Sequence, residues 1–86
     1  MFVIIGEEYP MPVAIPKGAT IEMLRANVCQ VLGLDKKKER WISLLLTSAP
    51  RILPLQKTVA LELTDGDLIR VGFIAPGLFL EHFIIH

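Results

Sequence analysis

The stretch "ATIEMLRANVCQVLGL", residues 19–34, decides the fold prediction because it contains the one convincing helix pattern in the chain. Thr20 stands where an N-cap side chain accepts a hydrogen bond from an amide of the first helical turn. Gly33 supplies the left-handed residue that ends many helices. The apolar residues recur at helical spacings and form one stripe, which consists of Ile21, Leu24, Val28, Val31 and Leu32. We therefore expect one amphipathic helix that packs this stripe against a core.

Strand patterns lie on both sides of this helix. Two short β-rich segments precede it, residues 1–6 and 11–16, and prolines in the second predict that it forms an edge of the sheet. Four further elements follow, which are a strand over 41–48, a short strand near 52–55, a helical turn over 59–62 and a last strand over 67–74. This order predicts an α+β fold with a mixed, four- to five-stranded sheet and one helix packed across one face.

Alternation along the strands over 41–48 and 67–74 predicts two faces. The inward residues are predicted to be Ile42, Leu44, Leu46, Ile69, Val71 and Phe73. The outward residues are then Trp41, Ser43, Leu45, Arg70 and Gly72. A slip of one residue would reverse every side chain of the first strand and bury Trp41 instead of Ile42, so the opposite register stays open. In the favoured register, Arg70 can lie over the Trp41 ring.

Composition limits the functional classes. The chain has 86 residues, typical of one domain, and 52% of them are apolar, which predicts a dense core and some apolar surface for a partner. Nine basic and nine acidic residues cancel, which argues against nucleic acid as the partner. The single cysteine, Cys29, excludes an intrachain disulfide. The uncharged runs are far shorter than the roughly 20 residues of a membrane span, and "MFVII" lacks a basic signal region, so we expect a cytoplasmic protein.

Four features suggest chemistry, and each also has a structural interpretation. Asp65 and Asp67 flank a glycine, a pattern that favours a tight turn over a metal or proton-transfer site. His82 and His86 are four residues apart but are better explained as surface residues of a tail than as a metal site. Cys29 has no histidine near it in the chain and is expected to be a buried thiol. We predict no catalytic residue, no cofactor and no metal.

The fourth feature is the connector "KKKER", residues 36–40, which places four basic residues among five. Such a run is usually a solvated segment of the surface, and we expect that role here. Contact with an acidic partner or a phosphate group stays open as the alternative.

The helix pattern and the stretch "KTVALELTDGDLIRV", residues 57–71, occur in an order that resembles the ubiquitin-like β-grasp family. The pattern is most similar to small bacterial members, such as the YukD-type proteins of type VII secretion and the small subunits of toluene-monooxygenase-type hydroxylases. The resemblance covers residues 1–74 and implies a β-grasp domain followed by an apolar C-terminal tail, residues 75–86.

The resemblance implies a non-catalytic domain that binds a protein partner through the open face of its sheet. The predicted protein-binding residues are the outward set of Trp41, Ser43, Leu45, Arg70 and Gly72, and Trp and Arg are frequent at binding hot spots. One alternative is a small structural subunit of a multicomponent enzyme or secretion complex. A covalent protein modifier is disfavoured because the chain contains no Gly-Gly pair. Homo-oligomer formation through the tail stays open.

Overall fold

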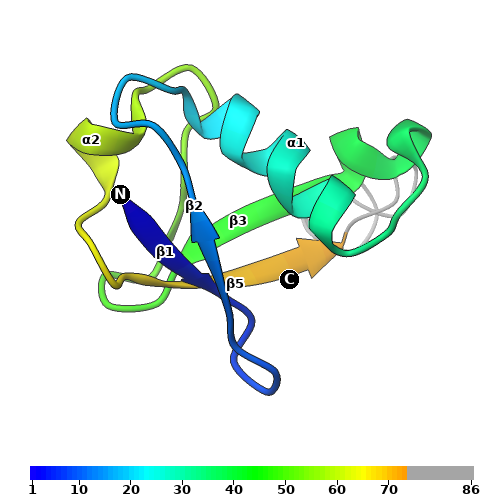
Figure 1. The fold of residues 1–86 in the computed structure, drawn as a ribbon, viewed down its shortest axis with the longest axis horizontal. Coiled ribbons are helices and arrows are strands. Elements are labelled where there is room, and N and C mark those ends of the chain that lie inside the picture. Colours follow the sequence, from blue (N-terminus) through cyan, green and yellow to red (C-terminus); the bar gives the residue numbers. More distant parts are fainter. Residues whose placement is uncertain (74–86) are drawn as a thin grey trace, which may run out of the picture.

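The computed structural model describes residues 1–73, shown in Figure 1. Along the chain the elements are β1 (Phe2–Ile5), β2 (Met11–Ala14), α1 (Ile21–Val31), the 3-10 helix η1 (Lys36–Trp41), β3 (Ile42–Leu46), β4 (Arg51–Ile52), α2 (Val59–Glu62) and β5 (Leu68–Phe73). The predicted α+β class is confirmed. The predicted tail, including His82 and His86, lies outside the described residues.

The strands form one sheet of five strands in the order β2-β1-β5-β3-β4. The first and last strands, β1 and β5, pair in parallel at its centre, and the other pairs are antiparallel, so the sheet is mixed as predicted. Strand β2, which contains Pro12, lies at one edge of the sheet, so this prediction is also confirmed. Helix α1 crosses one face of the sheet (Figure 1).

The core lies between α1 and the sheet. From the helix, Ile21, Leu24 and Val28 are fully buried, and from β3, Ile42, Leu44 and Leu46 are buried. The favoured register of β3 is therefore confirmed, since the alternative register would expose Ile42. The other buried residues come from β1, β2, β5, α2 and the connecting segments; among them are Val3, Ile5, Val13, Leu53, Val59 and Ile69.

Residues next to each end of α1 determine where the helix begins and ends. The Thr20 hydroxyl accepts a hydrogen bond from the Met23 amide at 3.2 Å, and Gly33 adopts a φ of +69° just beyond the helix, as predicted. The apolar stripe differs from the prediction in its last turn. Val31 and Leu32 are 44% and 41% exposed, whereas Cys29 is 3% exposed and takes the buried place. The buried stripe of α1 therefore ends at Cys29.

The strands in the second half of the described chain differ from the predicted ones. Residues 36–41 form η1, so β3 begins at Ile42 instead of Trp41 and ends at Leu46. Strand β4 contains Arg51 and Ile52 and ends before Leu53, which is buried. Phe73, predicted to face inward, lies directly opposite Ile42 in the ladder but is 48% exposed, because it is at the end of β5.

Candidate functional site

The candidate site is the sheet face opposite α1, here called the open face. The register places residues on it through direct cross-strand pairs, such as Ile4 with Leu68, Leu45 with Arg70, and Leu45 with Ile52. Their neighbours along each strand are the buried residues of the other face. The residues of this face considered below are Phe2, Ile4, Ser43, Leu45, Ile52, Leu68, Arg70 and Gly72.

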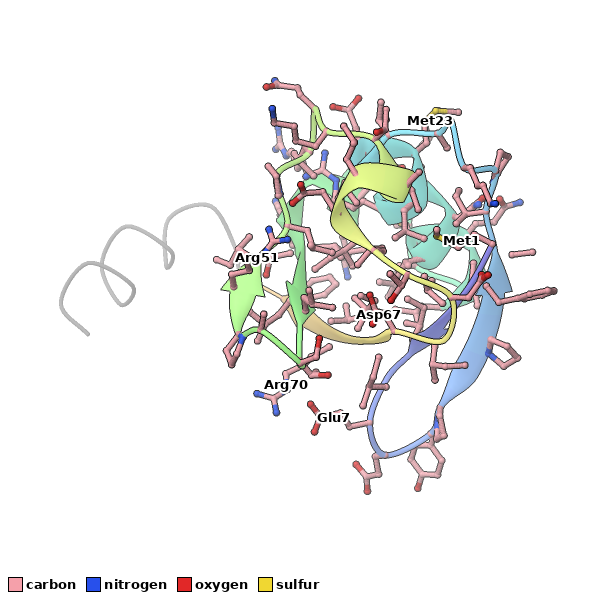
Figure 2. The ribbon with its side chains drawn as sticks, turned by 90° about the vertical axis from the view of Figure 1, so that its left-hand side faces the viewer. Met1, Glu7, Met23, Arg51, Asp67 and Arg70 are labelled. Carbon is pink, nitrogen blue, oxygen red and sulfur yellow. The ribbon has the colours of Figure 1, made fainter. Side chains whose placement is uncertain are left out.

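Arg70 is the cation of the open face. It lies directly opposite Leu45, and Leu45 lies directly opposite Ile52, so the three residues form a row across β5, β3 and β4. The Arg70 Nε donates to the Glu7 Oε1 at 2.5 Å. Figure 2 shows these two side chains pointing toward one another on the side of the sheet away from the helices.

The ion pair affects both charged groups. The hydrogen bond from Arg70 lowers the pKa of the Glu7 carboxyl below its ordinary value, and the same bond raises the pKa of Arg70. Both side chains are substantially exposed, 58% for Arg70 and 43% for Glu7, so water and salt weaken the attraction between them. The pair orients Arg70 without removing it from solvent.

Ser43 and Gly72 lie together on the open face as predicted. They are direct partners across β3 and β5, and a Cβ atom at residue 72 would lie 2.6 Å from the Ser43 Oγ. The serine hydroxyl thus covers the bare backbone of Gly72. A larger side chain at residue 72 would require the Ser43 hydroxyl to rotate away.

The structure corrects the prediction that Trp41 lies beside Arg70. Trp41 is the last residue of η1, so the alternation of β3 does not yet apply to it. Its ring contacts Phe73 in a T-shaped arrangement, with ring centroids 6.2 Å apart and an interplanar angle of 90°. Phe73 pairs with Ile42 in the inward-facing register, whereas Arg70 pairs with Leu45. Trp41 and Arg70 therefore have separate partners, Phe73 and Glu7.

Several apolar residues of the open face were missed by the sequence analysis. Phe2 is 59% exposed and Ile52 is 50% exposed, and Ile4 and Leu68 are half-buried. Alternation in "MFVII" carried the signal for two of them, because burying Val3 and Ile5 directs Phe2 and Ile4 to the open face. Together with Leu45, these side chains give the open face an apolar surface, which adjoins Arg70 at Leu45 and Leu68.

A hollow of about 260 Å³ adjoins Arg70. Its walls come from the β1–β2 connection and from the end of α1, and they include Tyr9, Met11 and Leu32. Tyr9 is 82% exposed and Leu32 is 41% exposed. Sequence periodicity does not predict this hollow. Its walls combine a loop with the end of α1, and periodicity assigns that end of the helix to the core.

The two aspartates before β5 have a structural role, as predicted. The Asp65 Oδ1 accepts a hydrogen bond from the Phe2 amide at 2.9 Å, and the Asp67 Oδ2 accepts one from the Thr64 amide at 2.8 Å. Gly66 between them has a φ of +85°, which favours glycine. The carboxylates therefore close the turn and attach it to the start of β1.

Cys29 is buried, and its thiol lies 3.8 Å from the Leu34 carbonyl oxygen and 3.7 Å from that of Asp35. These contacts link α1 to the segment that follows it. Within residues 1–73, no group of three or more His, Cys, Asp or Glu side chains could hold a metal ion. None of the helices in the same range has the length and apolar character to cross a membrane.

A comparison with protein-family models found no family that matches this chain. A comparison with curated protein sequences found no significant match.

Proposed function

We propose that this chain is a non-catalytic, ubiquitin-like β-grasp domain that binds a protein partner through its open face. The arrangement of elements supports the proposal. Two N-terminal strands, one long helix and a last strand paired in parallel with the first are compatible with the topology that the resemblance implies. The sheet face opposite α1 is then the surface available to a partner.

One observation contributes most to the proposal, namely that exposed apolar side chains share this face with one arginine. Phe2 and Ile52 are at least half exposed, and Leu45 lies between Ile52 and Arg70. The centres of protein interfaces are rich in apolar side chains and arginine and poor in other charges. A partner that covers this surface would bury apolar area around an oriented guanidinium.

Arg70 gives the surface a polar anchor. A guanidinium has five N–H donors, and Glu7 accepts from the one at Nε. Because 58% of the Arg70 side chain is exposed, a carboxylate or a backbone carbonyl of the partner can reach its other donors. We infer that the partner presents an acceptor at this point and apolar side chains on either side of it.

The test compares substitutions on and off the open face. Leu45→Arg and Ile52→Arg place charges in the proposed contact and should each weaken the partner's affinity by at least roughly tenfold, which is a hot-spot loss. Leu61→Arg is the matched control, because Leu61 is 76% exposed but lies on α2, outside the sheet. The partner is captured from native lysate with the tagged wild-type chain, identified by mass spectrometry, and then titrated with each variant.

Thermal melting of each variant verifies that it is folded. If the two open-face variants bind the captured partner as tightly as the wild type, or if Leu61→Arg weakens binding equally, the open face is not the binding surface.

A further inference from the structure

A second charged surface lies between α1 and η1, and it includes no residue of the open face. Arg25 of α1 and three residues of η1 line a hollow of about 380 Å³, together with one carboxylate, Glu39. The three residues from η1 are Lys36, Lys37 and Arg40. We call this cavity the basic hollow.

The basic hollow has an excess of positive charge. Four cations and one carboxylate line it, which leaves three positive charges (four minus one) in a chain whose formal net charge is zero. The ion pairs found within residues 1–73 involve Arg51 and Arg70, so the four cations of the hollow form none there. A solvated surface segment normally mixes charges of both signs, whereas this cluster concentrates one sign in a concave site.

Arg25 provides an independent observation. Its Nε atom is buried and has no hydrogen-bond partner among the described residues. Buried polar groups in folded proteins are nearly always paired, so an unpaired one calls for a specific explanation. Arg25 is also a lining residue of the hollow. A guanidinium beside lysines is suited to an oxyanion, which accepts parallel hydrogen bonds from it.

A less charged hollow of about 330 Å³ adjoins the basic hollow and shares Lys36 and Glu39 with it. Ala26, Leu34 and Cys29 contribute to its walls. The two cavities together offer cations at one end and small or apolar side chains at the other. This combination matches an anionic group attached to an organic body better than it matches a free inorganic ion.

We propose that the basic hollow binds the phosphomonoester group of an organic molecule, whose organic part lies in the adjoining hollow. A phosphomonoester has a charge of roughly −1.5 to −2 at pH 7 and three acceptor oxygens. It therefore neutralises more of the excess charge than a carboxylate does. Arg25 and Arg40 would supply planar donors, and Lys36 and Lys37 would supply point charges.

The test is a titration of the isotope-labelled protein followed by NMR at pH 7.5 and low salt. Phenyl phosphate should produce saturable shifts in the amides of residues 25–40. Inorganic phosphate lacks the organic part and benzoate lacks the second charge, so both should bind more weakly. Arg25→Gln and Lys37→Gln should each weaken phenyl phosphate binding by roughly tenfold, as expected for a lost charged hydrogen bond.

Lys17→Gln is the matched control, because it removes one exposed lysine outside the hollow and should leave the affinity unchanged. If Arg25→Gln fails to fold, Lys37→Gln still decides the question, since Lys37 is exposed. The proposal is overturned if the shifts do not saturate, if benzoate binds as tightly as phenyl phosphate, or if Lys17→Gln and Lys37→Gln behave alike.

Two further probes distinguish the sources of the phosphate. A phosphoserine peptide that binds more tightly than glucose 6-phosphate would support a phosphorylated protein side chain as the ligand, and the reverse order would support a small phosphorylated metabolite. Tighter binding of a single-stranded oligonucleotide than of either would refute the phosphomonoester assignment, because its phosphates are diesters.

Discussion

Truncation of two neighbouring leucines tests the register on which the assignment of the open face depends. Leu44 is 1% exposed and lies at the centre of β3, facing α1. Leu45 is half-buried and lies on the open face, opposite Arg70. The same change, leucine to alanine, therefore samples the two faces of one strand at adjacent positions.

The losses in free energy of unfolding expected for the two variants differ by a factor of about three. Leu44→Ala leaves a cavity in the core and should lower the free energy of unfolding by about 3 kcal/mol, within the usual range of about 2–5 kcal/mol. Leu45→Ala removes a side chain that is only partly buried and should cost about 1 kcal/mol. A domain of 86 residues has a total stability of roughly 4–13 kcal/mol, so both variants should still fold.

Urea denaturation followed by tryptophan fluorescence and circular dichroism measures both losses. With an m-value of about 1–1.5 kcal/mol per M, Leu44→Ala should lower the midpoint by about 2–3 M and Leu45→Ala by about 1 M or less. Equal losses, or a greater loss for Leu45→Ala, would mean that β3 is turned over and that Leu45 belongs to the core. The residues assigned to the open face would then be wrong.

Three other predictions follow from the caps, the turn before β5 and the exposed ion pair. Thr20→Ala should lower the stability by about 1 kcal/mol. Thr58→Ala should lower it less, since the Thr58 side chain makes no capping bond. In thermal melts, Thr20→Ala should therefore have the lower melting temperature of the two. Gly66→Ala should lower the stability by about 1–2 kcal/mol. Its positive φ alone causes this loss, because no atom lies within 4 Å of the added Cβ. Urea titration should show no such loss for Gly18→Ala, where φ is not positive. The Glu7 carboxyl should titrate below its ordinary pKa of 4.5, so the contribution of its ion pair is fully present above pH 4.5 and lost as the pH falls through the lowered pKa. An NMR titration in which Glu7 keeps a midpoint of 4.5 would contradict that ion pair.

The features that the sequence predicted well depend on neighbouring residues. The cap at Thr20, the left-handed Gly33 and the turn around Gly66 are each specified within a few positions of the chain, and all three are present. The inward set of β3 was predictable for a related reason. Its three residues are all aliphatic, whereas the alternating set includes Ser43, so the aliphatic face is the better core.

The features that could not be predicted from the sequence depend on where one helix or strand ends relative to another. Periodicity assigned Val31 and Leu32 to the core, but it cannot show that the buried stripe of α1 ends at Cys29. Alternation assigned Trp41 to the open face, but it could not show that a 3-10 helix would delay the start of β3 by one residue. The basic hollow was also beyond prediction, because Arg25 joins the cluster of η1 only through tertiary packing.

The parallel pair at the centre of the sheet has a consequence for folding. Ile4 and Ile5 pair with Leu68 and Ile69, so the central strand β5 and its neighbour β1 come from opposite ends of the described chain. The β1–β2 hairpin and α1 are synthesised first, but they cannot complete their core until β5 has left the ribosome. Such long-range pairing slows folding and leaves apolar surface exposed in the meantime. We therefore expect β5, although it is the last strand to be made, to determine when the whole domain folds.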